Sequence, residues 1–208
     1  MMITVASRIE TAIREHLAPV LRADGFAGSG RTFRRVVGDW IQVVNVQGSR
    51  YGGQFAVNLG LQPSCIPDVK GNVPNPKKIT VDLCEFRRRM SDSTSREDKW
   101  WKHDATDAST AAAVLDAART YSQTGRSLLA EATADSADLN MVSVGGFAAG
   151  KFDFLGFGSA QCRMAFAMAR LRKAQGLSAE AREFANHALA CVGTASLLRA
   201  EIEAFLCP

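Results

Sequence analysis

Basic side chains gathered in the middle of the chain are the residues whose types and spacing are best suited to recognising a ligand. They are Arg31, Arg34, Arg35, Lys77, Lys78, Arg87, Arg88 and Arg89. Residues 31–104 carry 13 Lys and Arg against 8 Asp and Glu, a local charge of +5 in a chain of net charge +4. Such a segment attracts phosphates, and Trp100-Trp101 offers rings on which bases stack. The pattern indicates a polyanion site, unless the arginines pair with acids or cover apolar surface.

A glycine-rich segment resembles the start of a phosphate-binding P-loop. Residues 145–151, Gly-Gly-Phe-Ala-Ala-Gly-Lys, fit its first seven positions. Phe152, however, stands where that loop needs a Ser or Thr hydroxyl for magnesium. Gly156 and Gly158 also interrupt the helix whose amides should hold the phosphates. We therefore do not expect nucleotide hydrolysis.

The remaining polar residues suggest no catalytic or metal-binding arrangement. Asp39, Asp68 and Lys70 follow the order of a metal-dependent nuclease, but Asp68 and Lys70 fall in a proline-rich segment rather than on a strand. The 3 His and 5 Cys are accompanied by neither a nucleophile elbow nor a Cys-x-x-Cys pair. We predict no catalytic residue, no metal ligand and no cofactor.

The elements that position these residues begin with an amphipathic helix. Apolar side chains from Val5 to Leu21 recur every three or four residues, and Gly25 ends the pattern. Pro19 should distort this helix near its end, because proline has no amide proton to donate.

Three β-rich runs follow, at residues 31–37, 40–48 and 54–62, and predict an antiparallel meander. Gly38-Asp39 is typical of a two-residue hairpin, and this turn places Phe33 opposite Val44. Matching apolar faces then place Val57 opposite or near Val44.

Alternation along the strands places polar side chains on the sheet face opposite the core. Arg34, Asn45 and Asn58 fall on this face, and on a later strand Arg87 and Arg89 share a face that Arg88 does not. The candidate binding residues are Arg34, Asn45, Asn58, Arg87, Arg89, Trp100 and Trp101. The alternatives are that this face is simply solvated or covered by another part of the chain, and that the tryptophans anchor the core.

The rest of the chain predicts one more strand and then helices. Ile79, Val81 and Leu83 alternate as a fourth strand after a long loop with four prolines, and periodic segments at 160–174, 178–191 and 195–206 predict helices. The expected fold class is α+β, with an N-terminal helix, an antiparallel β-meander of about four strands and a helical C-terminal half. We expect an α+β domain over residues 1–104 and a mainly helical region over 105–208, packed on or beside it.

Composition limits the cellular locations that we expect for the protein. With 47% hydrophobic and 22% charged residues, the chain resembles an ordinary folded domain. It shows no apolar stretch suited to a secretory leader or membrane span, and its scattered cysteines fit reduced thiols. We expect a soluble, cytoplasmic protein with no membrane partner.

Several short motifs occur in one order along the first half of the chain. They are Gly25-Phe26, Arg31-Thr32-Phe33, Ile41-x-Val43-x-Asn45-x-Gln47, Phe55-x-Val57-Asn58-Leu59-Gly60, Cys84-x-Phe86-Arg87-x-Arg89 and Trp100-Trp101. In this order the chain resembles the bacterial family called domain of unknown function 4304. The resemblance implies a small α+β domain and assigns no catalytic residue, cofactor or partner.

We therefore favour a non-enzymatic binding or interaction module, whose unidentified partner could be another protein. The first alternative is a nucleic-acid-associated protein that uses the basic segment 31–104. The second is an enzyme whose site is assembled from residues distant in the sequence.

Overall fold

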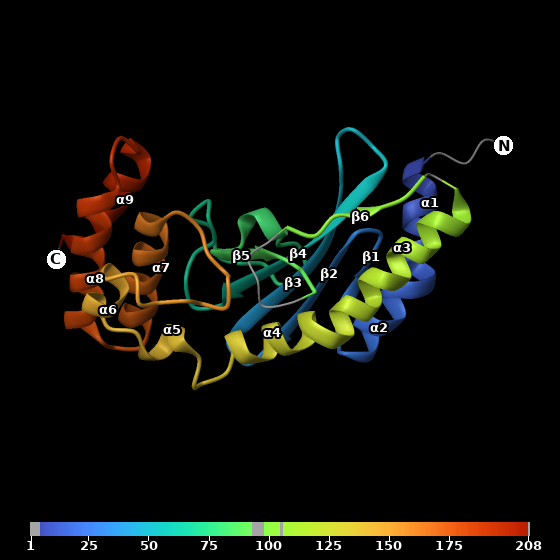
Figure 1. The fold of residues 1–208 in the computed structure, drawn as a ribbon. Coiled ribbons are helices and arrows are strands. Elements are labelled where there is room, and N and C mark those ends of the chain that lie inside the picture. Colours follow the sequence, from blue (N-terminus) through green and yellow to red (C-terminus); the bar gives the residue numbers. More distant parts are fainter. Residues whose placement is uncertain (1–4, 93–97, 105, 208) are drawn as a thin grey trace.

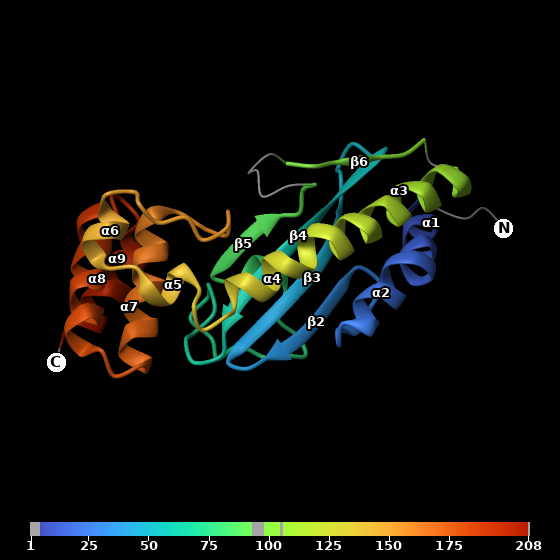
Figure 2. The same ribbon diagram turned by 60° about the horizontal axis from the view of Figure 1, so that its bottom comes forward.

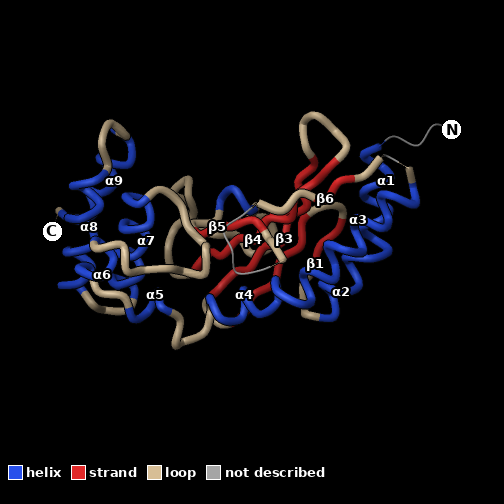
Figure 3. Tube along the Cα trace, in the orientation of Figure 1, coloured by secondary structure: helices blue, strands red, loops and turns tan. Residues whose placement is uncertain are grey.

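The computed structural model describes residues 5–92, 98–104 and 106–207, with side chains described from Arg8 onward. Figure 1 shows an elongated molecule in which a sheet lies between two groups of helices. The first group, near the N-terminus, lies along the sheet, and the second, near the C-terminus, lies at its far end. Figure 3 shows the same division by element type, with strands in the middle.

The predicted N-terminal helix is confirmed, and its distortion is a π-helical turn. It runs as α1 (Val5–Ala12), η1 (Ile13–Leu17) and α2 (Ala18–Ala23), with Pro19 in the first turn of α2. In η1 the Ala18 amide donates to the Ile13 carbonyl, five residues back. Ile13, Leu17 and Leu21 are buried, so the apolar stripe faces the sheet as its spacing predicts.

Six strands form one sheet within the described ranges, and their neighbours are antiparallel. The strands are β1 (Ala27–Ser29), β2 (Thr32–Val37), β3 (Trp40–Gly48), β4 (Gln54–Pro63), β5 (Phe86–Arg89) and β6 (Trp101–Lys102). The order is β1-β2-β3-β4-β5, and β6 also pairs with β4. The three predicted runs became β2, β3 and β4, so the meander is confirmed.

The predicted register at the first hairpin is also confirmed. Phe33 pairs with Val44, and Val44 pairs with Leu59, which leaves Val57 on the same face two residues along, opposite Val46. These side chains are buried under the helices, and we call this side the helix face. The opposite side, which carries Arg34, Asn45 and Asn58, is the loop face.

The fourth strand was predicted in the wrong place. Residues 79–83 form no strand, because Val81–Leu83 is the short 3₁₀ helix η2. The strand that follows β4 in the sheet order is β5 instead. Ile79 and Cys84 pack against Ile41 and Val43 on the loop face in a second, smaller core. These alternating apolar residues therefore pack onto a face of the sheet instead of adding a strand at its edge. Alternation with a period of two does not distinguish these two arrangements.

Gly60 makes this close contact possible. A Cβ atom at this position would lie 2.8 Å from the Cys84 Sγ and 3.0 Å from a Val81 methyl group. The long loop before η2 is held by the buried Asp68, whose carboxylate accepts the amides of Lys70 and Asn72 at 2.8 and 3.0 Å. The proline-rich loop thus covers part of the loop face.

Helices follow the sheet, as predicted. They are α3 (Asp107–Thr120), the π-helical η3 (Tyr121–Gly125), α4 (Arg126–Ala132), α5 (Asp138–Met141), α6 (Val144–Ala148), α7 (Gln161–Ala174), α8 (Ser178–Cys191) and α9 (Ser196–Leu206). In Figure 2, α3 and α4 cross over the strands on the helix face, whereas α6 to α9 group beyond the end of the sheet. The protein is therefore α+β with a helical C-terminal half.

Buried charges join the C-terminal helices to the sheet. The Glu85 carboxylate, 1% exposed, lies 3.2 Å from Arg163 and 3.5 Å from Arg170, both on α7. Burial raises the pKa of Glu85, although the two guanidinium groups act against this shift. One continuous apolar core contains residues of both halves of the chain. The predicted division at residue 104 stays a prediction. The helices α3 and α4, which come after residue 104, lie on the sheet (Figure 2).

Candidate functional site

A polar row crosses the loop face at right angles to its strands. The register pairs Thr32 with Asn45, Asn45 with Asn58, and Asn58 with Arg89. Three of the predicted binding residues are therefore direct cross-strand neighbours. The amide of Asn45 donates to the Thr32 hydroxyl at 2.9 Å, and that of Asn58 donates to Gln47 at 3.0 Å. Both asparagine amides of the row therefore already donate a hydrogen bond to a neighbouring strand.

The arginines of the loop face already have partners. Arg34 donates to the carbonyls of Ile79 and Lys78, which ties β2 to the covering loop. Arg89 lies 2.5 Å from the Asp98 carboxylate. Arg87, in contrast, is exposed and makes one long 3.3 Å contact to the Asp82 carbonyl.

The two adjacent tryptophans lie in different environments. The Arg89 guanidinium lies 4.5 Å from the ring centre of Trp100, so Trp100 joins the candidate residues on β5. Trp101 instead stacks on Phe55 at 5.8 Å and donates its indole N–H to Asp116 at 2.9 Å. Trp101 is 3% exposed and belongs to the core, which is the alternative weighed for it from the sequence.

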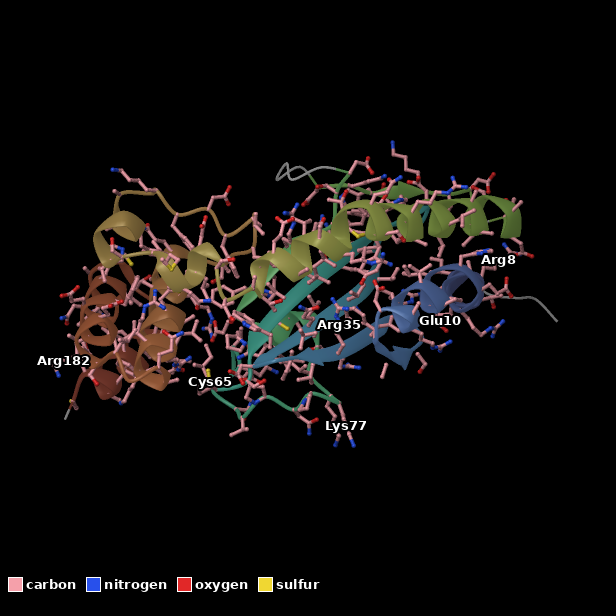
Figure 4. The ribbon with its side chains drawn as sticks, turned by 90° about the horizontal axis from the view of Figure 1, so that it is seen from below. Arg8, Glu10, Arg35, Cys65, Lys77 and Arg182 are labelled. Atoms are coloured by element: carbon pink, nitrogen blue, oxygen red, sulfur yellow. The ribbon has the colours of Figure 1, made fainter. Side chains whose placement is uncertain are left out.

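The other basic residues of the middle segment mostly serve the fold. Arg88 points away from Arg87 and Arg89, as predicted, and its buried side chain donates to the Leu155 carbonyl. Arg35, labelled in Figure 4, donates to the Asp24 carbonyl at 2.6 Å. Lys77, in the same figure, lies on the outer side of the loop that covers the sheet.

Asp24, at the end of α2, connects the N-terminal helix to η3 and α4 on the helix face. Its carboxylate accepts the Tyr121 hydroxyl and the Arg126 Nε, each at 2.8 Å. Burial favours the neutral acid, but the hydrogen bonds from Arg126 and Tyr121 outweigh it and hold the pKa of Asp24 below its ordinary 3.8. Burial, followed by the bond to Asp24, raises the pKa of Tyr121. This cluster stabilises the helix packing.

A cleft of about 570 Å³ opens where β5 meets the segment between α6 and α7. Four phenylalanines line it, Phe147, Phe152, Phe154 and Phe157, and Phe152 and Phe154 are stacked with ring centres 6.0 Å apart. The backbones of Arg87 and Gly158 form a two-way bridge, with N···O distances of 3.3 and 3.0 Å. We call this site the aromatic cleft.

Few residues of the cleft lining carry polar side chains. They are Arg87, Ser159 and Gln161. The buried Ser159 Oγ has no hydrogen-bond partner among the described residues. A buried hydroxyl without a partner is uncommon in folded proteins, and a ligand group or a water placed in the cleft would satisfy it. The sequence indicated Arg87 as a binding residue but none of the phenylalanines, of which Phe147 and Phe152 were considered only in the comparison with a P-loop.

The segment that resembled a P-loop is built differently. Gly145 and Gly146 lie inside α6, whose N-cap Ser143 accepts the Gly146 amide at 3.1 Å, and the exposed Lys151 follows the turn at residues 149–150. No strand precedes the glycines in this described part of the chain, since residues 138–141 are helical. Across the described ranges, no three His, Cys, Asp or Glu side chains lie close enough together to hold a metal ion.

A family model supports the resemblance seen in the sequence motifs. The model for the domain of unknown function DUF4304 matches residues 17–120, from η1 to the end of α3. The chain belongs to the DUF4304 family. No curated protein and no solved structure matched the chain.

The two candidate surfaces differ in how much of each lies within the residues that the DUF4304 model matches. The polar row of the loop face and Arg87 fall inside the matched residues, whereas the four phenylalanines of the aromatic cleft lie beyond residue 120. The cleft therefore combines one edge strand of the DUF4304 region with a C-terminal segment. None of the described helices combines the length and hydropathy needed to cross a bilayer.

Proposed function

We propose that this DUF4304 protein is a non-enzymatic binding module, and that its ligand occupies the aromatic cleft. The observation that carries the proposal is a 570 Å³ concavity lined by four phenylalanines and one arginine without a carboxylate partner among the described residues. Small-molecule sites are commonly concave, largely apolar and furnished with a few polar groups that orient the ligand. The ligand is a small molecule with a flat apolar body and an anionic group.

The chemistry of the lining supports each part of this ligand class. Phe152 is half-buried beside buried aromatic neighbours, so its ring offers apolar area to a flat ligand. Arg87 supplies a fixed positive charge with several donors, and it gives up only one long hydrogen bond on binding. Ser159 adds a hydroxyl group that has no hydrogen-bond partner among the described residues.

Nucleic-acid binding is the second candidate function, because three of the arginines are already paired or buried. Arg34 and Arg89 are occupied by carbonyl groups and a carboxylate, and Arg88 is buried, so few guanidinium groups are available to phosphates. Exposed Lys77 and Lys78 remain on the covering loop. A titration with single-stranded DNA against salt distinguishes the two functions, because phosphate binding weakens steeply as salt increases.

Five thiols without a disulfide partner support a reducing, cytoplasmic location, which is part of the proposal. Cys84 is buried, while Cys65, Cys191 and Cys207 are exposed. Localisation of a tagged full-length chain by cell fractionation tests this part separately.

The fluorescent dye 8-anilinonaphthalene-1-sulfonate tests the ligand class, because it joins a flat apolar body to a sulfonate. We expect saturable binding of one dye per chain. Arg87→Gln should weaken the affinity by about tenfold, since a hydrogen bond to a charged group is lost. Phe152→Ala should weaken it by a similar factor through lost ring contact.

Two controls separate the cleft from nonspecific dye binding. Arg50→Gln removes an exposed arginine of the β3–β4 hairpin, outside the cleft lining, and should leave the affinity unchanged. The neutral analogue N-phenyl-1-naphthylamine should lose affinity with Phe152→Ala but not with Arg87→Gln. Equal dye affinities in wild type, Arg87→Gln and Phe152→Ala would refute the proposed site.

A further inference from the structure

Two cysteines lie at the same level of the helical hairpin formed by α7 and α8. Each helix has 14 residues, and residues 175–177 join them, so the first turn of α7 lies beside the last turn of α8. Cys162 is the second residue of α7, and Cys191 is the last residue of α8. Figure 1 shows the two helices side by side at the C-terminal end of the molecule.

Both cysteines continue the contact stripes of their helices. Cys162 precedes the buried Ala165 by three residues, and Cys191 follows the buried Ala188 by three residues. Residues three or four apart share one face of a helix. Both helices bury small side chains, namely Ala165 and Ala169 on α7 and Ala181, Ala185 and Ala188 on α8. Small side chains allow helix axes to approach to about 8 Å, the lower end of the usual range.

The environment of the two thiols agrees with this placement. Cys162 is partly buried against the core, and Cys191 is exposed at the end of its helix. Burial raises the pKa of Cys191, and the Cys162 thiol adds to the shift. Neither has a disulfide partner in the structure.

We infer that Cys162 and Cys191 form a redox-active dithiol that peroxide converts into an intrachain disulfide across the open end of the α7–α8 hairpin. One thiol gives up its proton and its thiolate attacks a peroxide oxygen. The O–O bond breaks, the sulfur becomes a sulfenic acid, and the departing hydroxide takes up the proton and leaves as water. The second thiolate then attacks that sulfur, the S–O bond breaks and a second water leaves. Two thiols and one hydrogen peroxide thus give one disulfide and two waters, and a cellular dithiol reductant reverses the change.

The cross-link would act next to the aromatic cleft. Gln161 and Met164, on either side of Cys162, line the cleft, so the disulfide fixes one of its walls to α8. This consequence rests on the proposed function, whereas the dithiol itself does not. Formation of the disulfide is therefore measured without any ligand.

The test treats the full-length protein with stoichiometric hydrogen peroxide and measures the intact mass, followed by peptide mapping without reduction. We expect a loss of two hydrogens and a peptide pair joined through Cys162 and Cys191. Cys162→Ser and Cys191→Ser should each abolish this product. The matched controls Cys65→Ser and Cys207→Ser remove other exposed thiols and should retain it. Oxidation of the wild type should raise the Tm by about 5 to 10 °C, because the cross-link restricts the unfolded chain.

Three results would overturn the inference. The first is a mapped disulfide that joins other cysteines, and the second is oxidation that stops at sulfenic or sulfinic acid on separate thiols. The third is a joined peptide pair that occurs only between chains, seen as a dimer on a nonreducing gel. Dye binding unaffected by a confirmed disulfide would contradict only the link to the cleft.

Discussion

Arg172 offers the sharpest test of how the C-terminal helices are held together. It is 1% exposed, and its Nη2 donates to the carbonyls of Leu139, Asn140 and Val142 at 3.1, 3.1 and 3.2 Å. These carbonyls lie at the end of α5, where a helix has no further amides of its own to satisfy them. One guanidinium from α7 therefore supplies the donors that α5 lacks. Arg172→Met removes them while keeping a similar apolar stem.

The expected loss of stability depends on how far water can replace each hydrogen bond that Arg172 makes. The bond to the Leu139 carbonyl is buried, and losing its donor costs about 1–3 kcal/mol. The bonds to Asn140 and Val142 are only partly buried, so water replaces much of what they lose. Glu180, whose side chain is 49% exposed, contributes little through its 3.0 Å ion pair with Arg172. We expect a total loss of about 2–4 kcal/mol in unfolding free energy.

Urea unfolding measures this loss as a shift of the midpoint at an unchanged slope. The matched control is Arg199→Met, because the Arg199 side chain is 43% exposed and its ion pair with Glu203 is long, at 3.9 Å. We expect the control to change stability by less than about 0.5 kcal/mol. A loss below about 1 kcal/mol in Arg172→Met would show that the α5 carbonyls do not depend on this guanidinium, and the reasoning would fail.

Two further predictions concern the sheet and its helix layer. Asp24→Asn should cost about 1–2 kcal/mol at pH 7, because the carboxylate accepts bonds from Tyr121 and Arg126. Since the folded-state pKa of Asp24 is lowered, its stabilisation is present above the unfolded value and lost as pH falls through the folded value. Urea unfolding at pH 7 and pH 3 should show the difference shrinking, and a constant difference contradicts this. Gly60→Ala should cost about 1–3 kcal/mol by thermal unfolding, and adding Cys84→Ala should restore part of it, because the new methyl group meets the Cys84 sulfur.

The faces of the meander could be predicted from the sequence because they depend on local chemistry. Alternation with a period of two decides which side chains share a face, and the Gly38-Asp39 turn fixes the register of Phe33 with Val44. The same reasoning placed Arg88 apart from its neighbours and located the C-terminal helices within a residue or so of α7, α8 and α9.

Sequence alone therefore determined the α+β class, the helices and the residues that face the loop side of the sheet. Only the tertiary structure decided that residues 79–83 cover the sheet while β5 extends it, and that Trp101 is in the core while Trp100 is beside Arg89. It also decided that Arg87 meets an aromatic segment far along the chain. The physical reason is that alternation and periodicity express which side of an element is buried. Which segment covers that side depends on how the apolar surfaces of the whole chain pack together, and one element by itself does not contain this information.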